Sequence, residues 1–370
     1  MGIVKTTRLF EKWLSRHTPL IAADLERKHT AMAESSFQFF RATFYRWVQR
    51  WHKLCPNESK SPKVLAVGDL HVENFGTWRD DQGRMVYGIN DFDEAFPLSY
   101  SQDLIRLASS ALLAVRNEHL SISESRACRA ILDGYRESLT AGGRPIIVDE
   151  EHRWLAPLLG REVRDPVQFW QKMRNLPAAA MNPPASAKKA LRSVLPPVEL
   201  PIHIAHRVAG LGSLGKQRFV ALAEWRGGPI ARETKPLTPS AAAWAEGTRR
   251  PQLYYAEILQ TAVRCLDPLF TVRGAWVARR LAPDCCRIEL ASLPHARDDE
   301  RLLRAMGWET ANVHLGSRPA IDAVSQHIKR RRGDWLERAA VRMLADTMED
   351  WNDWREKLAR RATLAQKECK

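Results

Sequence analysis

The sequence lacks the features that mark several large classes of protein. No apolar run approaches the roughly 18 residues of a membrane-spanning helix. The start, residues 1–8, leads into charged positions and not into the apolar core of a signal peptide. The six cysteines do not have the spacing of metal ligands, and Cys285 and Cys286 are adjacent. We therefore expect a cytoplasmic protein with reduced thiols and no membrane partner.

Two catalytic motifs are also missing. The chain contains neither a Gly-x-Ser-x-Gly elbow nor a His-Glu-x-x-His helix, so serine hydrolases and zinc proteases receive little support. Positive charge, in contrast, is plentiful. The 57 Lys and Arg residues exceed the 43 Asp and Glu residues, which gives a net charge of +14. This excess favours anionic partners such as nucleotides, nucleic acid or acidic lipid headgroups, without choosing among them.

Hydrophobic periodicity predicts an α+β protein. Of the 370 residues, 45% are hydrophobic and 27% charged, which is ordinary for a globular chain. Helical patterns fill residues 1–55 and the chain from 296 onward, and prolines indicate a linker or crossing segment at 176–200. Short apolar runs predict strands at 64–67 and 85–89, and further strand patterns follow at 201–235 and 269–290.

The first group of candidate site residues follows two of these strands. Asp69, His71 and Asn74 come directly after the strand at 64–67, and Asp91 and Asp93 follow the strand at 85–89. We expect these strands to be neighbours joined by a hairpin, so that the polar side chains meet. An Asp and an Asn placed together offer the hard oxygen ligands of Mg²⁺, and a further Asp can orient or deprotonate a hydroxyl. The alternative is that these residues only cap turns.

The two motifs together resemble the catalytic loop and metal motif of the protein-kinase-like superfamily, above all its aminoglycoside and small-molecule phosphotransferase branch. The resemblance implies that Asp69 is the catalytic Asp and that Asn74 and Asp91 hold Mg²⁺. It leaves Asp93 as either a second metal ligand or a surface carboxylate. His71 is then a loop-bracing residue or a substrate contact.

Three further positions test this resemblance. Asp103 resembles the structural Asp that opens the next helix and braces the catalytic loop. Val67 departs from the pattern because many kinases have His there. Asp93 departs from it because protein kinases have Gly at that position, which puts a kinase-type switch of this loop in doubt.

A glycine-rich motif lies far along the chain. Gly210, Gly212, Ser213 and Gly215 belong to a G-x-G-x-x-G sequence. A dinucleotide-binding turn would need a helix straight after the glycines, but strand-like runs follow. The order strand, glycine turn, strand, strand resembles the kinase hairpin that covers phosphates, where glycine backbone closes over the ligand. Lys235, at the end of the next strand, resembles the lysine that contacts the α- and β-phosphates; alternatively, it is an exposed strand-end lysine.

The helix after Lys235 is expected to supply its carboxylate partner. Glu257 and Glu246 both qualify, and Glu257 is preferred. Pro236, directly after the lysine, is unexpected and could shift the end of the strand.

These parts stand in permuted order, with the catalytic half before the nucleotide-covering half. We expect a circularly permuted, kinase-like two-lobe fold with a small antiparallel-sheet lobe and a larger helical lobe. The sequence resembles an uncharacterised bacterial family of unknown function within the kinase-like folds. We expect N-terminal helices that pack on the large lobe at 1–60, and the catalytic-loop and metal-motif part of that lobe at 61–200. The small β lobe is expected at 201–293, and the C-terminal helices of the large lobe at 294–370.

The resemblance implies an ATP- and Mg²⁺-dependent phosphotransferase acting on a hydroxyl of an unknown small-molecule or protein substrate. Alternatives on the same fold are a catalytically silent nucleotide-binding pseudokinase and a nucleotidyl transferase that moves AMP. Nucleic-acid binding is less favoured, because the basic run at 329–332 is interleaved with nearby acidic residues as on a solvated helix face, and no helix-turn-helix or zinc-finger spacing accompanies it.

Overall fold

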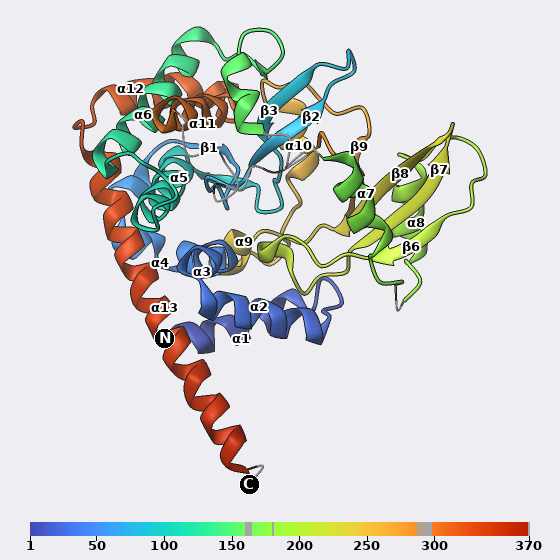
Figure 1. Ribbon diagram of the computed structural model, residues 1–370. Coiled ribbons are helices and arrows are strands. Elements are labelled where there is room, and N and C mark those ends of the chain that lie inside the picture. Colours follow the sequence, from blue (N-terminus) through green and yellow to red (C-terminus); the bar gives the residue numbers. More distant parts are fainter. Residues whose placement is uncertain (160–164, 180, 286, 288–289, 291–297, 369–370) are drawn as a thin grey trace.

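The computed structural model describes residues 1–159, 165–179, 181–285, 287, 290 and 298–368 (Figure 1). The fold is α+β, as predicted. Most helices gather in one part of the molecule, and a five-stranded sheet forms the other part beside them (Figure 1). The expected division at 293/294 lies outside the described residues.

The first 54 residues form helices, as their periodicity predicts. Their recurring aromatic side chains are buried because they face the main core, where Phe40, Phe44, Trp47 and Trp51 pack together with residues from distant segments. The helices of this segment are α1 (Ile3–Leu14), α2 (Ala22–Glu34), α3 (Ser36–Ala42) and α4 (Phe44–Leu54).

Two small antiparallel sheets carry the acidic loops. β1 (Lys63–Ala66) pairs with β4 (Phe96–Ser99), whereas β3 (Met85–Ile89) pairs with β2 (Phe75–Arg79) and β5 (Ile146–Ile147). The expected hairpin between β1 and β3 is therefore wrong, because β2 lies between them in the chain and takes β3 as its partner. The two loops still meet.

The register of the β2–β3 hairpin explains why the loops meet. Phe75 lies opposite Ile89, so the residues just outside this pair, Asn74 and Asn90, come together. The amide of Asn90 donates to the carbonyl of Asn74 at 3.1 Å. The loop after β1 and the loop after β3 are thus joined at their inner ends.

Long helices build the larger part of the molecule. α6 and α11 pack closely because each contributes a glycine at the crossing: a Cβ at Gly134 would lie 1.9 Å from the carbonyl oxygen of Arg304, and one at Gly307 would lie 2.0 Å from that of Ile131. These helices are α5 (Tyr100–Arg116), α6 (Glu124–Ala141), α11 (Asp299–His314), α12 (Ile321–Lys329) and α13 (Trp335–Glu368).

The second half of the chain forms the five-stranded antiparallel sheet. Its strand order is β6–β7–β8–β10–β9, and the glycine motif lies in the connection between β6 and β7. A second strand, and not a helix, follows the glycines, which excludes the dinucleotide-binding turn. The strands are β6 (His203–His206), β7 (Phe219–Trp225), β8 (Gly228–Pro236), β9 (Phe270–Arg273) and β10 (Trp276–Leu281).

Two helices cover opposite faces of this sheet. α7 (Pro166–Arg174) packs on the face of Val220 and Leu281, and α8 (Ala185–Arg192) packs on the face of Phe219 and Trp276. The segment 176–200 was expected to be a linker, but it contains α8 because an alanine-rich stretch follows two prolines. Two short helices, α9 (Ala241–Ala245) and α10 (Tyr255–Thr261), connect β8 to β9.

None of the helices in the described part of the chain is long and apolar enough to cross a bilayer. The described cysteines are thiols (Cys55, Cys128, Cys265 and Cys285), while Cys286 and Cys369 lie outside the described residues. The basic run at the end of α12 is largely exposed, and Arg331 within it bonds to Glu58.

Candidate functional site

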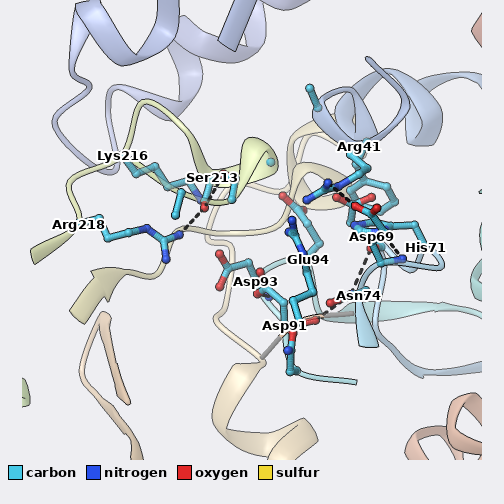
Figure 2. Close-up of a pocket in the computed structure, with 18 of the residues that line it drawn as sticks. Arg41, Asp69, His71, Asn74, Asp91, Asp93, Glu94, Ser213, Lys216 and Arg218 are labelled. Atoms are coloured by element: carbon cyan, nitrogen blue, oxygen red, sulfur yellow. Dashed lines mark hydrogen bonds and ion pairs between the residues drawn. The ribbon is translucent and has the colours of Figure 1, made fainter. Parts of the chain in front are cut away.

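Distant stretches of chain meet around one large cavity of about 680 Å³. Its walls come from both acidic loops, from helices α2 and α3, and from the glycine hairpin, which consists of β6, β7 and the connection at 207–218 that carries the glycine motif. Figure 2 shows Asp91, Asp93 and Glu94 facing Ser213 and Arg218 across this space. The acidic loops and part of the glycine motif predicted from the sequence therefore share one cleft.

Asp69 projects into the cleft with one carboxylate oxygen engaged. Arg106, which is 1% exposed, donates from Nε to Asp69 Oδ1 at 2.7 Å. The other oxygen, Oδ2, faces the glycine hairpin, since a Cβ at Gly212 would lie 3.6 Å from it. Burial raises the pKa of Asp69, although the charge of Arg106 opposes the rise. The result is a carboxylate fixed by one oxygen, with the other directed at the cleft.

Asp103 holds the loop that carries Asp69. It lies in the first turn of α5, and its two carboxylate oxygens accept from the amides of Val67 and Gly68 at 2.7 and 2.9 Å. The ring of His314, at the end of α11, lies 3.0 Å from the same carboxylate. Asp103 is fully buried, and its contacts brace the loop as the resemblance implied.

Asn74 ties the two acidic loops together. Its Nδ2 donates to the backbone carbonyls of Asp69, at 3.3 Å, and Asp91, at 3.1 Å. Because the amide nitrogen is used in this way, Oδ1 is the atom left to face a ligand. Asn74 lines the cleft and is 5% exposed.

Lys235 lies between the two carboxylates of the second loop. Its Nζ is 3.1 Å from Asp91 Oδ1 and 2.7 Å from Asp93 Oδ2. Burial opposes the ionisation of Asp91, but the charges of Lys235 and Arg279 outweigh it and hold the pKa of Asp91 below its ordinary value. Burial and the neighbouring charge of Asp91 raise the pKa of Asp93.

The expected pair between Lys235 and Glu257 is not formed. Glu257 is exposed in the first turn of α10, and Glu246 is exposed after α9. Lys235 instead turns toward the acidic loop, because it shares a sheet face with residues that line the cleft. Pro236 remains in β8 opposite Trp276, so it ends the strand without displacing the lysine.

The glycine hairpin is held by the N-terminal helices. The amide of Ile21 donates to the carbonyl of Gly215 at 2.8 Å, and Lys28 Nζ lies 3.4 Å from the carbonyl oxygen of Gly212. Gly215 has a φ of +101°, and a Cβ there would lie 2.5 Å from the side chain of Leu25. Burial lowers the pKa of Lys28 to about 8. Residues 20–28 therefore form a clasp on the hairpin that the sequence did not predict.

The rest of the motif lies beside this clasp. Gly210 and Ser213 line the cleft, and Ser213 Oγ accepts from Arg218 Nη2 at 2.7 Å. Lys216, the next residue after the motif, lines the same space and donates to Thr238 Oγ1 at 2.7 Å. The hairpin thus brings cationic and hydroxyl side chains to the cleft together with its glycine backbone.

Buried Glu233 gathers three arginines on the sheet side of the cleft. Arg207, Arg218 and Arg279 donate to it at 2.6, 2.7 and 3.0 Å. One carboxylate compensates one of three guanidinium charges, so this wall keeps an excess of positive charge. Two-residue periodicity along β8 places Glu233 and Lys235 on one face, and that pattern was the signal available in the sequence.

Glu94 is a second residue that sequence reasoning missed. It follows the acidic loop directly, accepts from Ser240 Oγ at 2.8 Å and accepts from the amide of Ala241 at 2.6 Å. Burial raises its pKa to about 7 despite the charge of Lys216. Its backbone carbonyl also lies where a Cβ of Gly68 would be, at 2.3 Å, so the position needs glycine.

His71 is enclosed and neutral. Its Nδ1 accepts from the amide of Glu73 at 3.2 Å, and its ring meets Phe37 edge to face. Burial, together with the charge of Arg41, lowers its pKa well below the ordinary value. This contact braces the loop, while the cleft lining still includes the ring.

Comparison with known proteins relates part of the chain to an uncharacterised bacterial family. No curated protein and no solved structure matches the chain significantly. Residues 20–166 match a family described as "Uncharacterized protein conserved in bacteria (DUF2252)". The matched segment contains both acidic loops and Asp103 and stops before the glycine hairpin, so the expected relation to an uncharacterised bacterial family is confirmed for this part of the chain.

Proposed function

We propose that the protein is an ATP- and Mg²⁺-dependent phosphotransferase with a kinase-like fold whose lobes occur in circularly permuted order. The observation that carries the proposal is the meeting of Asp69, Asn74 and Asp91 with the glycine hairpin at one cleft, where Lys235 bonds to Asp91. A small antiparallel sheet beside a larger helical part agrees with two lobes that clasp a nucleotide. We place the reaction in the cytoplasm, where ATP is available and thiols stay reduced.

The acidic loops have the donor set that Mg²⁺ needs. Asp91 and Asn74 Oδ1 would hold the ion. Asp93 would support it, since Asp93 Oδ1 is buried and has no hydrogen-bond partner among the described residues. Among the described residues, no three His, Cys, Asp or Glu side chains form a self-contained metal cluster. An ion held by one or two carboxylates, an amide, phosphate oxygens and water fits such a sparse set. Mg²⁺ neutralises the charge of the phosphates when it is bound.

The opposite wall suits the phosphates themselves. The backbone of Gly210 and Gly212 can donate N–H groups to phosphate oxygens without obstruction by side chains. Lys235 and the arginines around Glu233 add positive charge that a polyphosphate would neutralise. These groups act by positioning and electrostatics, which is how phosphoryl transfer is catalysed.

Asp69 supplies the acid–base function. Arg106 fixes Oδ1, so Oδ2 is the atom that can take the proton of an acceptor hydroxyl. The acceptor oxygen then bonds to the γ-phosphorus, and the bond from that phosphorus to the oxygen bridging to the β-phosphorus breaks. The electron pair of the broken bond stays on ADP. Burial of Asp69 raises its pKa and thereby favours proton acceptance.

A thermal-shift and turnover experiment tests the proposal. Mg-ATP should raise the melting temperature of the parent, because a ligand that binds only the native state stabilises it. Asp91→Asn and Lys235→Ala should lose most of this shift, whereas Asp81→Asn and Lys189→Ala, at exposed positions, should retain it. If both site variants bind Mg-ATP like the parent, the proposal is wrong.

Turnover separates the alternatives on the same fold. Release of ADP and transfer of label from γ-labelled ATP indicate phosphotransfer, whereas transfer from α-labelled ATP with release of pyrophosphate indicates AMP transfer. Binding without either reaction indicates a pseudokinase. Retention on DNA or RNA that disappears at moderate salt and is unchanged in Asp91→Asn would instead favour a nucleic-acid-binding protein.

A further inference from the structure

A second cavity lies behind the acidic loop, next to the cleft. Its volume is about 290 Å³, and its walls come from β2, α10, β9 and β10. Asn90, Arg279 and Leu281 line both spaces, so only one layer of side chains separates them. The proposed phosphotransfer does not use this second pocket.

Aromatic side chains form much of its wall. Phe92 meets Tyr255 edge to face at 5.8 Å between ring centroids, and Tyr255 stacks on Phe270 at 5.7 Å. Trp78 also lines the pocket, with its indole N–H satisfied by the carbonyl of Cys265 at 3.0 Å. A flat apolar group can pack against such rings with favourable geometry.

Two of the arginines that line this space carry buried donors without partners among the described residues. Nε and Nη1 of Arg264 and Nε and Nη2 of Arg280 are buried, and none of them has a hydrogen-bond partner in the described part of the protein. The guanidinium carbon of Arg264 lies 4.7 Å from the ring centroid of Trp78 and 5.0 Å from that of Phe92. A buried donor without an acceptor raises the free energy of the folded protein. A ligand that supplies the missing acceptor removes this cost, which favours its binding.

The charge balance selects the type of acceptor. Asp267 is the carboxylate among the lining residues that the structure describes, and burial raises its pKa. Arg264, Arg279 and Arg280 line the pocket together with this one acid. Other carboxylates lie near the arginines outside the lining: Glu309 near Arg264, Asp284 near Arg280, and Glu233, which bonds to Arg279. The lining itself therefore carries more cationic than anionic side chains, which favours an anion over a cation.

We propose that this pocket is a binding site for a small organic anion with a flat apolar body, of the aryl carboxylate class. Its carboxylate would accept hydrogen bonds from Arg264 and Arg280, and its ring would pack on the aromatic wall. The volume is at the lower end of the range for ligand pockets, about 300–1,000 Å³, and suits one ring with one anionic group rather than a nucleoside triphosphate.

A ligand in the second pocket would affect the carboxylates of the neighbouring cleft. Phe92 lies in the chain between Asp91 and Asp93, and its ring lines the second pocket. A ligand that packs against Phe92 therefore biases the position of both carboxylates. By thermodynamic linkage, Mg²⁺ or nucleotide in the cleft must change the affinity for the anion by the same factor.

The test uses 4-fluorobenzoate with the full chain and follows its fluorine NMR signal. Saturable binding is expected, whereas acetate, which lacks the ring, and 4-fluorobenzyl alcohol, which lacks the charge, should bind at least about tenfold more weakly. Arg280→Gln and Arg264→Lys should each weaken 4-fluorobenzoate about tenfold or more. Arg332→Gln, at an exposed position, should leave binding unchanged.

Several outcomes would overturn the proposal. One is the absence of saturable 4-fluorobenzoate binding to the parent protein, which would mean that the pocket holds only water. Another is binding that survives in a folded Arg280→Gln variant, which would place the anion elsewhere, such as in the cleft. Because the readout is binding of the probe and not ATP turnover, the proposal can fail while the phosphotransferase assignment stands, and the reverse also holds.

Discussion

Replacing Lys235 with alanine should destabilise the fold and make its stability depend on Mg²⁺. The Lys235 side chain is 5% exposed and that of Asp93 12%, so this pair is buried, whereas the Asp91 side chain is 43% exposed and partly screened by solvent. Removing one partner of a buried pair costs about 3–5 kcal/mol. We expect about 3 kcal/mol and a melting temperature lower by about 5 °C, since larger chains shift less per kcal/mol.

The pH dependence of this loss follows from the carboxylates. Lys235 helps to hold the pKa of Asp91 below its unfolded value, so the stabilisation is present above the unfolded pKa and disappears as the pH falls through the folded pKa. The difference between parent and Lys235→Ala should therefore be large near pH 7 and shrink below about pH 4.

Chemical denaturation at pH 7 and at about pH 2–3, with and without Mg²⁺, measures this effect. Mg²⁺ should recover part of the lost stability in Lys235→Ala, because it supplies positive charge where the ammonium was. The double variant Lys235→Ala/Asp93→Asn should also be more stable than Lys235→Ala alone, since it removes the unpaired buried charge. Equal unfolding free energies for the parent and Lys235→Ala at pH 7 would refute the reasoning.

Three other predictions concern positions that shape the cleft. Asp103→Ala should lower the unfolding free energy by about 3 kcal/mol, because it leaves two backbone amides buried without acceptors; denaturant titration measures this loss. Glu94, whose pKa burial raises from 4.5 to about 7, contributes stability that is full below pH 4.5 and lost as the pH rises through 7. Melting temperatures across pH 4–8 should therefore vary less in Glu94→Gln than in the parent. Gly215→Ala should cost about 2 kcal/mol, as judged by its melting temperature, since its φ is positive and Leu25 occupies the space of a Cβ; an unchanged value would contradict this geometry.

Local sequence signals were sufficient to place most of the candidate site. Asp69 and Asp91 follow short apolar strands, and the strand-end position of Lys235 was visible from the pattern before it. These features depend on residues within about ten positions of each other. The meeting of the acidic loops with Lys235 was predicted from the resemblance, because no local pattern reports a contact between residues 144 positions apart.

The predictions from sequence were wrong where strand pairing or side-chain packing involves residues far apart in the chain. The β1–β3 hairpin was wrong because β2, Phe75–Arg79, has no clear alternation and was not recognised as a strand. The predicted Lys235–Glu257 pair was wrong because neither the sequence of β8 nor that of α10 determines how α10 is rotated relative to the sheet. The arrangement of three arginines around Glu233 combines residues from a loop and two strands, so only the fold reveals it.

The backbone hydrogen bond between Ile21 and Gly215 couples the segment before α2 to the glycine hairpin. The hairpin cannot lift from the cleft without breaking this bond or carrying residues 20–28 along. An opening of the hairpin would therefore be tied to a movement of α2, a segment remote in sequence from every residue of the hairpin. The amide proton of Ile21 is consequently a natural reporter: its exchange with solvent should slow when the cleft is filled and quicken when the hairpin opens.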